Sequence, residues 1–135
     1  MIFLDTSGVI ALADDKDIFH PKAREMFEAS LQAGEEIVLH NYLVVESAAL
    51  LHRRLSRESS LRFLRESRTF SIVWVDNELH NQAEDHLAEY GSSDLSFVDV
   101  VSFLVMRSRG ISNFIGFDKH FIDAGFTQYG SKDIQ

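Results

Sequence analysis

Cysteine is absent from this 135-residue chain, and proline occurs only once, as Pro21. Without cysteine the protein can form no disulfide framework and no zinc site built on thiolates. The absence of cysteine is compatible with a reducing compartment. Domains commonly contain about 100 to 150 residues, so the length predicts a single domain over residues 1–135 with a core of its own.

Long hydrophobic runs are absent as well. No apolar stretch approaches the roughly 20 residues that cross a bilayer as a helix. Residues 1–12 lack the basic start and the small-residue cleavage site of a signal peptide. These features predict a cytoplasmic protein that makes no contact with a membrane.

Basic residues are few: 13 Lys and Arg stand against 21 Asp and Glu, and the net charge is −8. A protein that holds nucleic acid by charge alone is usually basic, so the composition disfavours a simple DNA-coating role. It does not exclude an enzyme whose acids bind metal ions. The basic residues are also unevenly placed, since residues 53–68 contain six arginines and two glutamates.

Hydrophobic patterning and turn residues predict strands that alternate with helices. We expect strands over 1–5, 36–40, 70–75, 111–117 and 126–129, and helices over 7–13, 20–33, 42–55, 56–68, 76–90 and 96–110, with a short one from 118. Asn41, Asp76 and Ser96 are the expected N-caps, and Gly91 is expected to end the helix over 76–90. The alternation predicts an α/β fold with a parallel sheet that is covered on both faces.

Four acids each lie alone inside an apolar stretch, where an ionised carboxylate is costly unless its charge is compensated. Two of them end expected strands and two fall in the first turns of expected helices, so all four can meet at the carboxyl edge of the sheet. Converging carboxylates repel one another, and Mg²⁺ or Mn²⁺ would remove that conflict. The four acids are Asp5 in FLDTSG, Glu46 in LVVESAAL, Asp99 in SFVDVVSF and Asp118 in FIGFDKHF.

Each acid also has a structural alternative. Asp5 and Asp118 could cap the helices that follow them, and Glu46 could pair with Arg53 or Arg54. Ser96 and Asp99 have the spacing of a capping box. The two kinds of role are compatible, because helix N-termini attract carboxylates in either case.

Four segments resemble PIN-domain proteins, and most closely the VapC-type toxin ribonucleases of toxin–antitoxin pairs. The segments are FLDTSGVIAL, NYLVVES, DLSFVDVVSFLVMRSRGI and FIGFDKHFIDAGF. The resemblance covers essentially the whole chain, and the last two segments are the most specific. It implies a three-layer α/β/α sandwich on a parallel sheet of four or five strands. It also implies that positions matching the four acids line a pocket for Mg²⁺ or Mn²⁺.

The same resemblance implies a function. It suggests endonucleolytic cleavage of RNA, with tRNA or another structured RNA as substrate, an antitoxin protein whose tail blocks the pocket, and a homodimer. Ser7 would orient Asp5 or a water molecule on the metal, and Ser96 matches a hydroxyl position before the third acid. Asp94 is expected to be a loop or cap residue first and a neighbour of the metal second.

The hypothesis for the reaction is metal-dependent hydrolysis of an RNA phosphodiester. Asp5, Asp99 and Asp118 would hold the metal, while Glu46 would bind a second ion or help to deprotonate the attacking water. His120 is interpreted as a surface or supporting residue rather than a catalyst.

Cationic side chains suggest where the RNA backbone would be held. Arg62, Arg65 and Arg68 recur along one side of a helix, and Lys119 lies beside the expected pocket. A solvated helix face that pairs with Glu58 and Glu66 is the alternative for the arginines.

Two hypotheses from other classes remain open at this point. One is a non-catalytic module that holds an antitoxin or another protein. The other is a phosphatase-like or receiver-like domain with an acidic pocket. A phosphatase of that kind would have D-x-D after the first strand, where Ser7 replaces the second acid. A receiver would use Asp76 but lacks the paired acids after the first strand.

Overall fold

A parallel sheet runs through the middle of the computed structural model, which describes residues 1–90 and 94–130. All four strand pairings are parallel, and the strand order is β3-β2-β1-β4-β5. The predicted parallel sheet of four or five strands is therefore confirmed, with five in this part of the chain. The strands are β1 (Ile2–Leu4), β2 (Ile37–His40), β3 (Ser71–Val73), β4 (Asn113–Ile115) and β5 (Thr127–Gln128).

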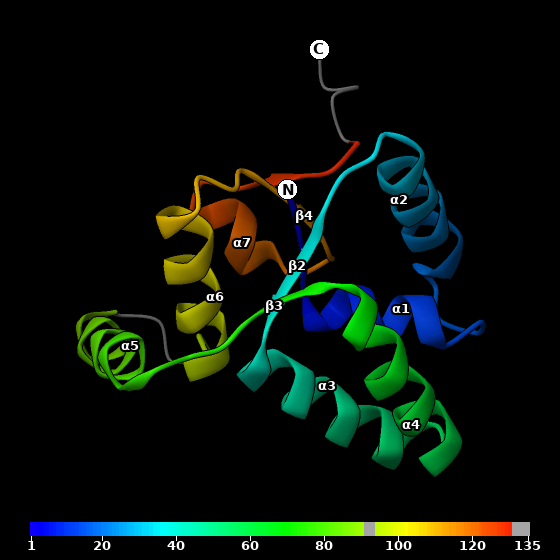
Figure 1. The fold of residues 1–135 in the computed structure, drawn as a ribbon, viewed down its shortest axis with the longest axis horizontal. Helices are drawn as coiled ribbons and strands as arrows, with labels where there is room; N and C mark the ends of the chain where they lie inside the picture. Colours follow the sequence, from blue (N-terminus) through cyan, green and yellow to red (C-terminus); the bar gives the residue numbers. More distant parts are fainter. Residues whose placement is uncertain (91–93, 131–135) are drawn as a thin grey trace.

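Helices cover both faces of the sheet, which confirms the three-layer sandwich (Figure 1). On one face Phe121 packs against Phe3, Phe103 and Phe114, with ring centroids 4.9–6.1 Å apart. On the other face α1 (Thr6–Ala13), α2 (His20–Gln32) and α4 (Arg57–Glu66) enclose an apolar hollow over Leu4. The helices are α1 (Thr6–Ala13), α2 (His20–Gln32), α3 (Asn41–Arg54), α4 (Arg57–Glu66), α5 (Asn77–Glu89), α6 (Phe97–Ser108) and α7 (Lys119–Asp123). None of these helices has the length and apolar character needed to cross a bilayer.

The topology creates a switch point beside β1. The chain steps from β1 to β2 and β3 on one side, and returns to β4 and β5 on the other. Leu4 pairs with Ile115, and the N–H of Asp5 donates to the carbonyl of Ile115 at 3.0 Å. Ligands of open α/β sheets bind at the carboxyl ends of strands near such a point. The fold therefore places Asp5 at the position where a ligand site is expected.

The predicted helix boundaries lie within two residues of the observed ones, and two of the differences have a visible structural cause. The N-cap of α3 is His40 and not Asn41: the N–H of Leu43 donates to His40 Nδ1 at 3.1 Å. Asn41 instead accepts a hydrogen bond from the N–H of Val75 at 2.6 Å, which ties α3 to the end of β3. The helix expected over 56–68 ends at Glu66 and continues as a 3₁₀ turn over Ser67–Thr69. Asp76 and Ser96 are N-caps as predicted, and the expected helix end at Gly91 lies outside the described residues.

His40 joins α3, which carries Glu46, to α6, which carries Asp99. Asp99 lies in the first turn of α6 as expected, whereas Glu46 lies in the second turn of α3 and not in the first. Its ring is fully buried, and Nε2 lies 2.9 Å from Ser102 Oγ on α6. Because Nδ1 accepts from Leu43, Nε2 carries the proton and donates to Ser102, whose hydroxyl donates to the carbonyl of Val98. Burial lowers the pKa of His40 to about 3, so the ring is neutral at physiological pH. The start of α3 is thereby held against α6.

Helix α1 lies very close to β4 because residue 8 is glycine. A Cβ placed on Gly8 would lie 2.5 Å from the carbonyl oxygen of Ile115 and 3.0 Å from Leu4 Cδ1. The first of these atoms belongs to the backbone of β4, so it cannot turn away as a side chain could. The close approach holds the start of α1 beside the carboxyl end of β4.

The substitution Gly8→Ala is expected to lower the free energy of unfolding by about 1 to 3 kcal/mol, the usual cost of overpacking. Inside a helix, alanine is otherwise favoured over glycine by about 1 kcal/mol, so the expected sign is opposite to that of helix propensity. Urea denaturation would measure it. The control is Ala49→Gly on the exposed side of α3, which reports propensity alone. A Gly8→Ala variant more stable than the wild type would contradict the packing argument.

Candidate metal and active site

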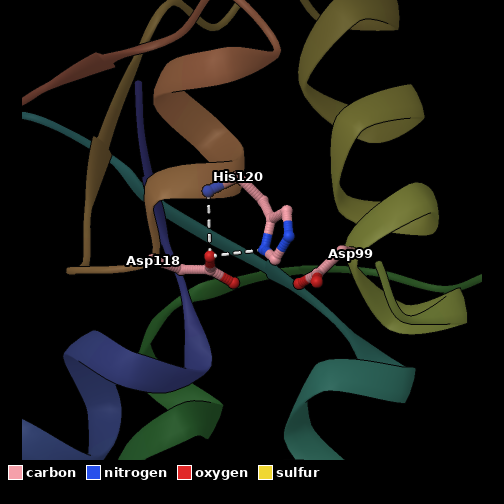
Figure 2. A group of neighbouring side chains, drawn as sticks. All are labelled: Asp99, Asp118 and His120. Atoms are coloured by element: carbon pink, nitrogen blue, oxygen red, sulfur yellow. Dashed lines mark hydrogen bonds and ion pairs between the residues drawn. The ribbon is translucent and has the colours of Figure 1, made fainter. Parts of the chain in front are cut away.

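Two of the four predicted acids form a tight group with a histidine. Ligand atoms of Asp99, Asp118 and His120 all lie within 4.8 Å of one another (Figure 2). Asp99 comes from the first turn of α6, Asp118 caps α7, and His120 belongs to the first turn of α7. Segments distant in sequence therefore bring their polar groups to one place at the carboxyl edge of the sheet.

Asp118 is held by the residue two positions after it. Its Oδ1 accepts a hydrogen bond from the backbone N–H of His120 at 2.9 Å, and His120 Nδ1 lies 2.8 Å from the same oxygen. The cap predicted for Asp118 is thus formed. Its second oxygen, Oδ2, is turned toward Asp99 (Figure 2).

Asp99 both caps α6 and contributes to the group. Its N–H donates to Ser96 Oγ at 3.1 Å, and the N–H of Ser96 donates to Asp99 Oδ2 at 3.4 Å, so the capping box is present. Burial raises the pKa of Asp99, and the charges of Asp118 and Glu46 raise it further, while the hydrogen bonds with Ser96 oppose that shift. Asp99 therefore both caps α6 and belongs to the acidic group.

Asp5 is the most deeply buried acid of the set, with 4% of its surface exposed. Ser7 Oγ donates to Asp5 Oδ2 at 2.9 Å and accepts from the N–H of Phe117 at 2.8 Å. Burial is the main reason that the pKa of Asp5 is raised to about 7. The hydrogen bond from Ser7 opposes the shift, and the charges of Asp99 and Asp118 add to it. Asp5 therefore lies within electrostatic reach of the tight group.

Glu46 lies on α3, half-buried, and is held by a residue of α1. Thr6 Oγ1 donates to Glu46 Oε1 at 2.8 Å, and Ser47 Oγ lies 3.3 Å from the Thr6 hydroxyl. The charge of Glu46 contributes to the raised pKa of Asp99, so the two carboxylates interact. The alternative ion pair of Glu46 with Arg53 or Arg54 is not formed in the described residues.

Three residues near the acids were not singled out as site residues from the sequence. Thr6 holds Glu46, and His120 holds Asp118. Gly116 makes room, because a Cβ there would lie 2.9 Å from Asp5 Cβ and 3.1 Å from Ser7 Oγ. The glycine directly after an apolar strand, in FIGFD, is the one sequence signal that could have indicated such a close approach.

Other candidate residues lie farther out. Asp94 is exposed, and its Oδ2 is 3.8 Å from His120 Nε2. Lys119 is exposed directly after Asp118. Arg62, Arg65 and Arg68 are exposed on α4 and the turn after it, where Arg62 lines the apolar hollow.

The path of the chain separates some candidates from the acids. Arg68 precedes the start of β3 and so lies toward the amino edge of the parallel sheet, opposite the acids. Asp76, the acid that a receiver would need, is an exposed cap at the end of the edge strand β3.

The donor set fits a small divalent cation. It offers carboxylate oxygens, which Mg²⁺ and Mn²⁺ prefer. Burial and acidic neighbours raise the pKa of Asp5, and a bound cation would favour its ionised form by offsetting that cost. The residues present are therefore compatible with such an ion.

The raised pKa of Asp5 predicts that the stability of the metal-free protein, measured in a chelator, depends on pH. The pKa of Asp5 is about 3.8 in the unfolded chain and about 7 in the fold, so the folded state binds more protons between these values. The contribution of Asp5 to the free energy of unfolding is fully present below pH 4. It is lost as the pH rises from about 4 through 7, and the total loss is a few kcal/mol. Asp5→Asn should remove this loss, which urea unfolding at pH 4 to 8 would measure.

The matched control is Asp85→Asn, which changes an exposed acid of α5. It should leave the pH profile of the wild type in place. If Asp5→Asn and the wild type lose stability in parallel as the pH rises, Asp5 is not the group that titrates.

Comparison with known proteins agrees with this arrangement. The PIN domain family matches residues 2–127. The chain is 32% identical over 130 residues to the 23S rRNA-specific endonuclease VapC20 of Mycobacterium tuberculosis, covering 95% of this chain and 97% of that protein. The crystal structure of VapC20, described as a sarcin–ricin loop cleaving toxin, superposes with a TM-score of 0.84 at 31% identity, covering 95% and 98% of the two chains.

The fold, the length of the match and the level of identity agree with one another. The VapC-type resemblance predicted from the sequence is confirmed. The chain belongs to the PIN-domain family and is a homologue of the VapC toxin endonucleases.

Proposed function

We propose that this protein is a divalent-metal-dependent endoribonuclease and the toxin of a toxin–antitoxin pair. The observation that supports this most directly is the convergence of acids from four separate segments beside the switch point of the sheet. Asp99 and Asp118 lie within 4.8 Å of each other, and electrostatic coupling links Asp5 and Glu46 to them. Homology to a ribosomal RNA endonuclease gives the substrate class.

Asp99, Asp118 and Asp5 would hold the cation. When bound, the cation would offset the negative charge of the carboxylates and act as a Lewis acid on the phosphate oxygens. Asp5 is presented by Ser7, and Asp118 by the N-terminal turn of α7. These hydrogen bonds orient the carboxylates before any ligand arrives, which lowers the cost of assembling the site.

Glu46 is suited to accept a proton from the attacking water or to bind a second cation. It is less buried than Asp5, and only one of its oxygens, Oε1, accepts the hydrogen bond from Thr6. The other oxygen can therefore serve a water molecule or an ion. Hydrolysis of a phosphodiester by water needs no covalent nucleophile, which agrees with a chain that has no cysteine.

The RNA would be held by cations outside the acidic group. Lys119 is the nearest of the candidates in sequence, directly after Asp118, and its exposed ammonium group could contact a phosphate beside the scissile bond. Arg62 and Arg65 on α4, with Arg68 after it, would contact phosphates farther along a large RNA.

A structured loop of ribosomal RNA is the proposed substrate, ahead of tRNA, because the relative at 32% identity is named for 23S rRNA. An antitoxin is the proposed protein partner. A basic segment of such a partner would complement the acidic pocket and exclude RNA from it. A homodimer is proposed from the family resemblance.

Cleavage of ribosomal RNA with Mg²⁺ or Mn²⁺ is the direct test. Asp99→Asn and Asp5→Asn are each expected to lower kcat at least about 100-fold, and a chelator should abolish cleavage. Asp85→Asn, on the exposed side of α5, is the control and should cut like the wild type. If both active-site variants cut normally, the nuclease assignment is wrong. Absence of cleavage by the wild type, together with tight binding of a partner peptide, would favour a non-catalytic module.

The role of the arginines is tested by salt dependence. Replacing Arg62, Arg65 and Arg68 together by Gln should raise KM for RNA and leave kcat unchanged. If all three contact phosphates, the slope of log binding constant against log salt should fall by about 2. The control is Arg109→Gln, an exposed cation after α6. An unchanged KM and slope would mean that these arginines form a solvated helix face.

A further inference from the structure

His120 contacts Asp118 twice, once through its backbone N–H and once through its imidazole ring (Figure 2). We infer that His120 is a positioning residue: its Nδ1–H holds Asp118 Oδ1 and so presents Asp118 Oδ2 to the cation. This inference rests on the proposed function, because it concerns the same metal site. It assigns a role to a residue that the sequence placed among surface or supporting side chains.

The proton on His120 can be located from its partner. A carboxylate that binds a cation is ionised and only accepts hydrogen bonds. With Asp118 in that form, the contact of 2.8 Å between Nδ1 and Asp118 Oδ1 places a proton on Nδ1. The backbone N–H of the same residue donates to the same oxygen at 2.9 Å. Two donors therefore converge on Oδ1, and this double contact fixes the rotation of the carboxylate.

The ring is held in place by the packing of α7. The side chains of His120 and Asp118 are 20% and 28% exposed, so their hydrogen bond is partly shielded from water. The next residue, Phe121, is fully buried, and its ring lies 5.0 Å from Phe103 and 4.9 Å from Phe114. Because Phe121 anchors this one-turn helix in the core, the backbone of His120 is held beside Asp118.

The outer nitrogen of His120 has a weaker neighbour. Nε2 lies 3.8 Å from Asp94 Oδ2, which is beyond hydrogen-bond distance, and the Asp94 side chain is 74% exposed. Exposed pairs of this kind contribute little.

The test measures the binding of Mn²⁺ to the whole protein. The electron paramagnetic resonance signal of Mn²⁺ that remains free in solution reports how much is bound. His120→Ala is expected to weaken the affinity by about 10- to 100-fold, the range known for residues that orient metal ligands. His120→Asn places an amide N–H near the position of Nδ1 and should keep most of the affinity. His120→Gln places its amide near Nε2 instead and should behave like His120→Ala.

Controls separate this role from a structural one. His52→Ala removes an exposed imidazole of α3 and should bind Mn²⁺ like the wild type. Thermal unfolding of each variant in a chelator shows whether the fold is intact. A merely structural role would lower the unfolding temperature of His120→Ala and His120→Asn alike, without the expected difference between Asn and Gln in Mn²⁺ affinity.

Three outcomes would overturn the inference. If His120→Ala binds Mn²⁺ no more weakly than the wild type, the ring does not position Asp118. If His120→Asn and His120→Ala weaken Mn²⁺ binding equally and leave Mg²⁺ binding unchanged, the ring is a direct ligand of the metal. If the wild type itself binds no Mn²⁺, the proposed metal site fails, and this inference fails with it.

Discussion

Burial of a carboxylate at the end of the central strand is the constraint on which the rest of the site depends. Asp5 is almost fully enclosed and faces the charges of Asp99 and Asp118, so its ionised form is costly in the bare protein. The surrounding chain accommodates it by steric room at Gly116 and by one hydrogen bond from Ser7. A divalent cation is the simplest group that would relieve the remaining electrostatic cost.

Each acid is oriented by a polar neighbour: Ser7 for Asp5, Thr6 for Glu46, Ser96 for Asp99 and His120 for Asp118. His40 fixes the helices that carry two of these acids, because it joins the start of α3 to α6 through hydrogen bonds with Leu43 and Ser102. In the described residues no buried polar side-chain atom lacks a partner. The carboxylates are thus held in place by the folded chain, which is the condition for a site that binds its ion without large rearrangement.

The sequence predicted most of the fold, because apolar runs and caps report local structure. The errors occur where a distant residue competes for a side chain. Asn41 is a residue type favoured at N-caps, but its side-chain oxygen accepts a hydrogen bond from the N–H of Val75, 34 positions later. His40 caps the helix instead. His120 was predicted to be a surface or supporting residue, and its contact with Asp118 agrees with the supporting role. Arg68 lies toward the opposite edge of the sheet from the acids, which follows from the direction of β3 and not from residue spacing along a helix.

The sequence by itself determined the alternation of strands and helices, the four acids that interrupt apolar stretches, and the family resemblance. These properties depend on neighbouring residues, whose side chains share one element. Only the tertiary structure decided which acids come within 4.8 Å of each other, that Glu46 is held by Thr6, and that a Cβ at position 116 would collide with Asp5. Such distances depend on strand order and on the packing of helices across the sheet, and no local pattern encodes them.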